Sequence, residues 1–237
     1  MSEAGVRDLF TRGGREFMGM RTLAVIARKG GSGKTTTSLQ LALAAHRRGM
    51  AVMLADADPQ HSASQVLKGR TGAGPGCVET AGPKLFALQV AAMRSGVDAL
   101  VIDTPAGPES DVGHAIVVAD FCILVVRPTF LDIAAAVSTT EIIRRLGRKA
   151  LVVLTQAPFS RGGGECETVL KAREALRFTS LPVAETVIRA RRGYQIALDA
   201  GRSVEDMPQH AAAGAEIAAL WSEIERAAYG RLHLRSA

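Results

Sequence analysis

With 237 residues, the chain is long enough for one α/β domain with a sizeable buried core, and no break in composition argues for a second domain. Hydrophobic residues make up 47% of the sequence and aromatic residues only 4%, which favours an aliphatic core like that of a parallel sheet covered by helices. The net charge of +6 is compatible with nucleic acid or an anionic membrane as partner, and charge alone does not choose between them.

The first residues and the cysteines exclude several classes of protein. Residues 1–20 carry charges of both signs and no apolar signal-peptide core, so we expect a flexible N-terminal arm followed by a single domain over residues 21–237. No apolar run reaches about 18 residues, which argues against a transmembrane helix. Cys77, Cys122 and Cys166 lie far apart without a CxxC pair, which argues against a zinc or iron–sulfur site and favours a reducing cytoplasm.

A glycine-rich segment from Arg28 to Thr36 lies between an apolar run, residues 22–27, and a predicted helix, residues 35–46. A strand, a glycine-rich turn and a helix start direct backbone N–H groups and a helix dipole at one point, which suits a polyphosphate. The pattern is the end of a P-loop, in which Lys34 reaches the β/γ-phosphates and the Thr35 hydroxyl holds Mg²⁺. The general P-loop pattern also asks for glycine at position 28, where this sequence has arginine.

The following elements alternate between strand and helix. A short apolar run over residues 51–55 ends at Asp56, and together with the first strand and helix it predicts a right-handed βαβ unit. We expect a loop over residues 68–83, because this stretch is rich in glycine and proline. Further strands are expected at residues 99–102, 121–126, 151–154 and 183–188, and helices at residues 85–94, 109–119, 131–146, 167–178 and 211–229. This alternation predicts a doubly wound, mainly parallel sheet with helices on both faces, the P-loop NTPase architecture.

Two acidic segments follow strands of this predicted sheet. Asp103 ends the run Leu-Val-Ile-Asp and is the natural Walker B carboxylate for Mg²⁺, which keeps most of its hydration shell. Asp56 and Asp58 lie in the sequence Asp-Ala-Asp-Pro-Gln after the second strand. Because the carboxyl ends of parallel strands meet at one edge of a sheet, the P-loop and these carboxylates are expected to lie together.

The segment KGGSGKTT resembles the deviant Walker A box of the ParA/MinD family of ATPases, and the DxDPQ sequence is similar to the family's second aspartate box. The resemblance implies that Lys29 reaches the nucleotide of a partner chain in an ATP-dependent homodimer. It also implies that Asp56 supports the Mg²⁺ shell and that Asp58 positions the attacking water, so that the catalytic residues are Lys29, Lys34 and Asp58. The implied ATP-binding residues are Lys29, Gly30, Gly31, Ser32, Gly33, Lys34, Thr35 and Thr36, with Thr35, Asp56 and Asp103 at the metal.

The resemblance continues toward the C-terminus. Residues 118–128 are similar to the family's strand ending at a proline, and residues 188–204 resemble the ParA pattern of a basic pair, an alanine-containing helix and a glycine. One departure is Gln156, where many relatives have asparagine, so the residues that contact adenine are not assigned.

Positive charge gathers in the C-terminal half: residues 142–202 contain 12 Lys/Arg and 5 Asp/Glu. Such a run can be an ordinary solvated face, but beside the family resemblance it favours a surface that binds DNA without sequence preference. The residues we expect to contact DNA are Arg189, Arg191, Arg192 and Arg202.

The leading hypothesis is a short ParA-type partitioning or positioning ATPase. It would hydrolyse ATP slowly with Mg²⁺, bind nonspecific DNA as an ATP-bound dimer on the nucleoid, and be stimulated by a ParB-like or cargo-adaptor protein. The alternative is a MinD-like, membrane-associated positioning ATPase. The segment over residues 211–229 argues against that alternative, because Glu216, Glu223 and Glu225 make its polar face acidic and we expect it to pack on the domain. A metal-cluster-carrier ATPase would need interface cysteines, which the sequence does not pair.

Overall fold

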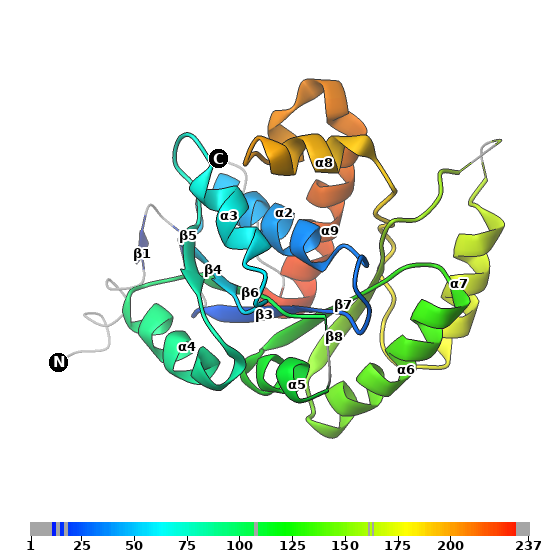
Figure 1. Cartoon of the computed structure of the whole chain (residues 1–237), viewed down its shortest axis with the longest axis horizontal. Coiled ribbons are helices and arrows are strands. Elements are labelled where there is room, and N and C mark those ends of the chain that lie inside the picture. The colour runs from blue at the N-terminus through cyan, green and yellow to red at the C-terminus, as the bar shows by residue number, and fades with distance from the viewer. Residues whose placement is uncertain are drawn as a thin grey trace.

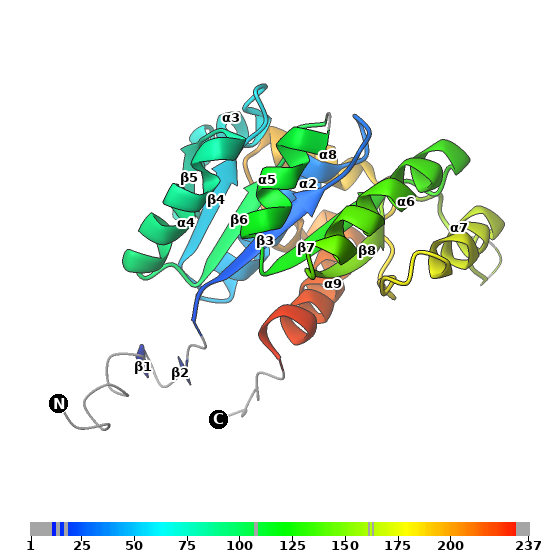
Figure 2. The ribbon, with the colours of Figure 1, turned by 90° about the horizontal axis from the view of Figure 1, so that it is seen from below.

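The computed structural model describes residues 11–12, 15–16, 19–106, 109–160, 162 and 164–230. The expected arm, residues 1–20, lies largely outside these residues; the part described includes a short antiparallel pair, β1 (Thr11–Arg12) and β2 (Arg15–Glu16). A six-stranded, all-parallel sheet in the order β5-β4-β6-β3-β7-β8 follows, with helices on both faces (Figures 1 and 2). This confirms the predicted fold class.

The strands of this sheet are short and largely apolar, because both faces are covered. They are β3 (Arg21–Ile26), β4 (Val52–Asp56), β5 (Gly76–Glu79), β6 (Ala99–Asp103), β7 (Phe121–Val126) and β8 (Lys149–Leu154). The helices are α2 (Lys34–Arg47), α3 (Ser62–Lys68), α4 (Leu85–Arg94), α5 (Glu109–Val118), α6 (Phe130–Arg145), α7 (Glu167–Arg177), α8 (Arg192–Asp199) and α9 (Ala211–Tyr229). Short 3₁₀ turns are η2 (Gly82–Lys84), η3 (Val204–Asp206) and η4 (Pro208–His210).

Two apolar layers hold the sheet between its helices. Residues of α2, α8 and α9 form one layer with alternate strand residues, and Trp221 of α9 is fully buried in it. Residues of α4, α5, α6 and α7 form the other layer on the opposite face. The packing of α9 on the domain, expected from the sequence, is confirmed, and its apolar face is therefore not available to a membrane. Among the described residues, no helix is both long and apolar enough to span a bilayer.

Two expectations about secondary structure were wrong. Residues 68–83, expected to be a loop, contain β5, an edge strand whose residues are mostly exposed and which therefore lacks an apolar run. Residues 183–188, expected to be a strand, lie beside β8 without a regular ladder: one isolated bridge joins Val183 to Val152 of β8, and a second joins Arg189 to Ala157, beyond the end of β8. The register shifts by one residue between these bridges, which interrupts a regular ladder.

The outer side of this irregular segment is closed by carboxylates of α9. Glu223 accepts hydrogen bonds from the backbone N–H groups of Glu185 and Thr186 at 2.9 and 2.8 Å, and Glu216 accepts one from Arg189 N–H at 3.1 Å. An open sheet edge offers unpaired N–H groups to other chains, and these carboxylates satisfy them. The acidic face of α9 therefore has a structural role.

Candidate functional site: a nucleotide cradle at the carboxyl edge of the sheet

The glycine-rich loop links β3 to α2 and has a backbone that only glycine adopts without strain at two positions. Gly31 and Gly33 have φ values of 70° and 87°, in the left-handed region. Gly33 precedes the first turn of α2, and its carbonyl accepts the Thr37 N–H at 2.9 Å. No side chain caps this helix, so its first N–H groups are available to an anion.

Lys34 is the first residue of α2 and is only 6% exposed. Burial lowers the pKa of its ammonium group, while the nearby charges of Asp103 and Asp58 raise it and leave a smaller net decrease. A buried cation at the start of a helix is costly unless an anion pairs with it. Lys34 is thus placed to bind the phosphates expected from the sequence.

Asp103 ends β6 beside the loop and is fully buried. Its Oδ1 accepts a hydrogen bond from the Ser38 hydroxyl at 2.9 Å, whereas its Oδ2 has no hydrogen-bond partner among the described residues. Burial raises the pKa of the Asp103 carboxyl to about 7, against the opposing effect of the Thr35 and Ser38 hydroxyls. Such an unsatisfied buried oxygen is destabilising in the free protein, and a bound cation or its water would satisfy it.

Asp56 and Asp103 are paired in register on the adjacent strands β4 and β6. The Asp56 carboxylate accepts the backbone N–H groups of Ser64 at 2.8 Å and Asp58 at 3.3 Å, so it also organises the turn into α3. Asp58 is half-buried and accepts the Gln60 N–H at 2.9 Å. The sequence expectation that these carboxylates lie at one edge with the P-loop agrees with the structure.

Lys29 lies at the edge of the loop, beside an ion pair from the next strand. Arg127 donates to Asp132 through Nε at 2.9 Å and Nη2 at 3.2 Å, and the Thr129 hydroxyl donates to the same carboxylate at 2.6 Å. Burial alone would raise the pKa of Asp132, but these hydrogen bonds and the charges of Arg127 and Lys29 outweigh it and lower the pKa. In the single chain, Lys29 therefore has an acidic neighbour of its own.

Two residues that sequence reasoning did not assign support the loop from the end of β8. The Thr155 hydroxyl donates to the Ser32 carbonyl at 2.7 Å, and the Gln156 amide donates to the Gly31 carbonyl at 2.7 Å. Gln156 and His61 are two of the three non-glycine residues with positive φ among those described, each at 50°. Backbone strain of this kind is stored at functional sites, and both residues border the cradle.

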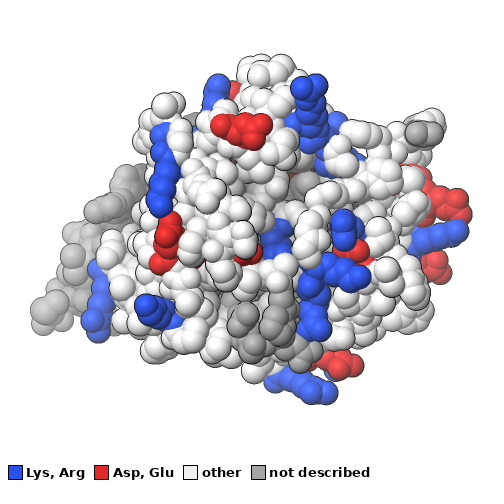
Figure 3. Space-filling model, in the orientation of Figure 1, with Lys and Arg blue, Asp and Glu red and all other residues white. Residues whose placement is uncertain are grey.

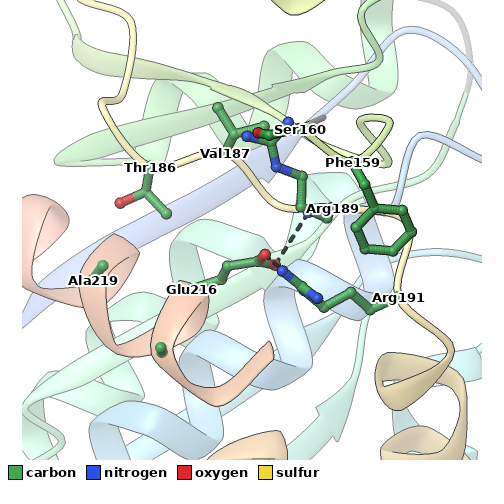
Figure 4. A pocket seen from close by; sticks show the side chains of 9 residues that line it. Phe159, Ser160, Thr186, Val187, Arg189, Arg191, Glu216 and Ala219 are labelled. Atoms are coloured by element: carbon green, nitrogen blue, oxygen red, sulfur yellow. Dashed lines mark hydrogen bonds and ion pairs between the residues drawn. The ribbon is translucent and has the colours of Figure 1, made fainter. Parts of the chain in front are cut away.

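The four arginines expected to contact DNA fall into two kinds. The Arg189 side chain, 12% exposed, makes two hydrogen bonds to Glu165 at 2.9 and 2.6 Å, and Arg191 bonds Glu216 at 2.7 Å. Arg189 and Arg191 line a pocket of about 480 Å³ with Phe159, over whose ring Arg191 lies at 5.1 Å (Figure 4). Arg192 and Arg202 are exposed near the two ends of α8.

The cradle fits Mg²⁺ with a nucleotide. Magnesium prefers oxygen ligands and usually takes only one or two from the protein, with phosphates and water completing its shell. Asp103 offers an unused buried oxygen and Thr35 a hydroxyl on the same side of the loop. Among the described residues, no group of three or more His, Cys, Asp or Glu could hold a metal ion.

A parallel sheet with a glycine-rich loop at its carboxyl edge, a buried lysine and a strand-end aspartate defines a P-loop nucleotide-binding protein. A family model described as the CobQ/CobB/MinD/ParA nucleotide binding domain matches residues 23–204. The chain belongs to this family.

Two proteins of similar sequence support the assignment to this family. The chain is 35% identical over 189 residues to "Maintenance of carboxysome distribution protein A" from Gloeobacter kilaueensis, covering 78% of this chain and 83% of the relative. A protein of the same description from Halothiobacillus neapolitanus is 30% identical over 198 residues, covering 77% and 86%.

Solved structures share the fold. A Cyanothece McdA variant in complex with ATP matches with a TM-score of 0.73 and 16% identity, covering 91% of this chain and 99% of that one. The Pyrococcus furiosus cell division ATPase MinD matches with a TM-score of 0.72 and 19% identity, covering 87% and 98%.

Proposed function

We propose that the protein is a Mg²⁺-dependent ATPase that positions a large cargo through an ATP-controlled dimer. The observation that supports this proposal most strongly is that Lys34, Asp103 and Asp58 lie together at the loop to which Lys29 belongs. The curated relatives, named for distribution of carboxysomes, support positioning of a large body as the class of task.

The chain's own residues divide the chemistry among them. Lys34 and the N–H groups of the loop neutralise the phosphates, while Thr35 and Asp103 hold Mg²⁺ and Asp56 orders the neighbouring turn. When bound, Mg²⁺ supplies charge neutralisation for phosphoryl transfer. Asp58 is the half-buried carboxylate left to orient the attacking water.

Lys29 makes the nucleotide site depend on a second chain. Its family role is to cross to the partner's nucleotide, and in the single chain it instead lies near Asp132. When the dimer closes, Lys29 would therefore leave Asp132 and approach the phosphates of the partner's nucleotide. We propose slow turnover that is accelerated by a cargo-adaptor protein, because the chain must stay dimeric long enough to hold its cargo.

The proposed anchor is nonspecific DNA, which places the ATP-bound protein on the nucleoid. Figure 3 shows Lys and Arg side chains spread over one face in separate groups, without one continuous patch. Arg192 and Arg202 are exposed and carry the first contacts, whereas Arg189 and Arg191 would have to exchange Glu165 and Glu216 for phosphates. We therefore expect Arg192 and Arg202 to contribute more to DNA affinity than the other two.

The test measures DNA binding in three nucleotide states: no nucleotide, ADP, and a slowly hydrolysed ATP analogue. Binding of a random-sequence duplex should require the analogue and weaken steeply between about 50 and 300 mM salt. The double variant Arg192→Ala/Arg202→Ala should lose at least about tenfold in affinity with ATPase activity retained. The variant Lys29→Ala should bind ATP as a monomer and lose ATP-dependent DNA binding.

A matched control is Arg144→Ala/Arg145→Ala, which removes the same charge from the far end of the sheet. Equal DNA affinity in all nucleotide states would reject the switch. An equal loss in the control pair would show that net charge, and not the surface at α8, governs binding.

A further inference from the structure

A second concave surface lies outside the nucleotide site, between η2, α4 and α5 and the end of α6. Its lining is largely apolar, and the hollow has a volume of about 400 Å³. Phe86, Val117 and Leu146 stand at its walls with 67%, 50% and 42% of their surfaces exposed. Water against three large apolar side chains is unfavourable, so this groove, which we call the α4–α5 groove, is suited to cover by another apolar group. Figure 2 shows α4, α5 and α6 side by side on this face.

A glycine inside α5 keeps the groove open. Gly113 lines it, and a Cβ atom built at Gly113 would meet no heavy atom within 4 Å. Glycine in a helix interior costs about 1 kcal/mol relative to alanine, and neither a positive φ nor internal packing requires it at this position. The open space above Gly113 therefore lets an outside group approach the helix backbone closely.

Positive charge predominates around the groove, although one of the cations, Arg145, forms an ion pair with Glu141 at 3.9 Å. The segments that supply or flank its lining, residues 82–94, 112–119 and 144–149, contain six Lys/Arg and no Asp/Glu. Arg148 donates a hydrogen bond to the Val117 carbonyl, which fixes one of these cations at the wall. Asp111 and Asp120 directly flank residues 112–119 in sequence, and Asp120 accepts the Thr22 N–H at 2.8 Å. The remaining cations, all exposed, are Lys84, Arg94, Arg144, Arg145 and Lys149.

We propose that the α4–α5 groove binds an amphipathic helix of a partner protein, with a bulky apolar side chain over Gly113 and carboxylates facing the basic rim. An amphipathic helix lays its apolar face into an apolar groove, and the excess of cations in the surrounding segments favours carboxylates on its polar face. A membrane would meet the exposed side chains as a flat surface and would leave the hollow unfilled. The site shares no lining residue with the nucleotide cradle, so it does not depend on the proposed ATPase function.

The probe is a labelled synthetic helix of about 16 residues with Leu and Phe on one face and Glu on the other, added to the full chain. Its matched control has Lys in place of every Glu. Fluorescence anisotropy should show the acidic peptide binding at least about tenfold more tightly at about 50 mM salt, with the difference shrinking at about 300 mM as the rim is screened.

Three variants locate the binding. Gly113→Leu places a bulky side chain in the groove and should weaken binding of the acidic peptide at least about tenfold. Its melting temperature should be unchanged or higher, because leucine favours the helix and its Cβ atom meets no heavy atom within 4 Å. Arg144→Glu/Arg145→Glu reverses the charge of part of the rim and should weaken binding of the acidic peptide by a similar factor. Phe178→Glu removes an apolar side chain elsewhere that is even more exposed, at 87%, and should leave the affinity for the acidic peptide unchanged. ATP-analogue affinity should be the same in all of them, which separates this result from the fate of the ATPase proposal.

Equal affinity for both peptides, or an unchanged affinity in Gly113→Leu, would overturn the proposal. So would binding of vesicles rich in anionic lipid that Gly113→Leu abolishes, which would assign the groove to a membrane. A sedimentation shift from dimer to monomer in Gly113→Leu without nucleotide would assign it to a second copy of the chain.

Discussion

Aspartates lie at both ends of the strands in the sheet, and they have different roles at the amino ends (here called the amino edge) and at the carboxyl ends (the carboxyl edge). At the amino edge, Asp98 accepts the Ala51 N–H at 2.7 Å and Asp120 accepts the Thr22 N–H at 2.8 Å. At the carboxyl edge, Asp103 is fully buried with one oxygen unpartnered among the described residues, and its carboxyl pKa is raised to about 7. The satisfied carboxylates hold turns together, whereas the unpaired oxygen of Asp103 is available to the Mg²⁺ ion of the proposed nucleotide site.

The positive charges that form one run in the sequence also lie at opposite ends of the sheet's strands. Arg144, Arg145 and Lys149 lie where α6 ends and β8 begins, at the amino edge. The segment of Arg189 follows β8 at the opposite edge, since Arg189 pairs with Ala157 just after that strand ends. At about 3.3 Å per residue, the length of β8 separates the two groups by roughly 20 Å. The number of Lys and Arg residues between positions 142 and 202 is therefore not by itself evidence for one continuous DNA-binding surface.

The largest expected effect is at Lys34. We expect Lys34→Ala to weaken binding of an ATP analogue at least about 100-fold, because it removes the buried cation from the phosphates. Isothermal titration calorimetry measures the loss. Lys149→Ala, at the amino edge of β8, is the control and should bind normally. A loss of less than threefold in Lys34→Ala would remove this lysine from the phosphate site.

The next effect concerns turnover without loss of binding. Asp58→Ala should lower steady-state phosphate release about 100-fold, as expected for a positioned catalytic carboxylate, while analogue affinity stays within about threefold. A coupled phosphate assay and a binding titration on the same preparation separate the two. Asp199→Ala removes an exposed aspartate of α8 and should turn over normally. Turnover of the Asp58 variant at the rate of the unaltered protein would exclude its catalytic role.

The sequence was sufficient for those parts of the site that depend on local order. The P-loop is contiguous, and Asp56 and Asp103 follow apolar runs, so strand ends could be predicted and their meeting at one edge followed from the parallel sheet. Thr155 and Gln156 were missed as supports because they bond carbonyls more than 120 residues away.

The ion pairs of two arginines and the edge strand β5 could not be predicted from the sequence for a similar reason. Arg189 and Arg191 looked available because Glu165 and Glu216 lie 24 and 25 residues from them in sequence. The strand β5 gave no apolar signal, since three of its four residues are exposed at the edge of the sheet. Sequence patterns report burial and local turns, whereas these contacts depend on which distant segments the fold brings together.

The raised pKa of Asp103 gives a prediction about stability and pH. Because the folded pKa, about 7, lies above the unfolded value of 3.8, the folded chain holds more protons between these values, and stability falls as pH rises through this window. Asp103→Asn removes the ionisation and should stabilise the nucleotide-free chain at pH 8, raising its Tm by several degrees. The gain should vanish near pH 4, and Mg²⁺-dependent ATPase activity should fall in the same variant. A Tm difference independent of pH would contradict the raised pKa.

The smallest expected effect is at Asp120, on the other edge. Asp120→Ala leaves the N–H of Thr22, a fully buried residue, without its acceptor, which should destabilise the chain by about 1–2 kcal/mol. Urea unfolding measures the change, and analogue affinity and turnover per folded molecule should match the unaltered protein. Asp103→Asn and Asp120→Ala thus shift stability at pH 8 in opposite directions although each removes one carboxylate from a strand end. If Asp120→Ala instead changed nucleotide affinity more than threefold, the two edges would be coupled, and the division of structural from functional aspartates would not hold.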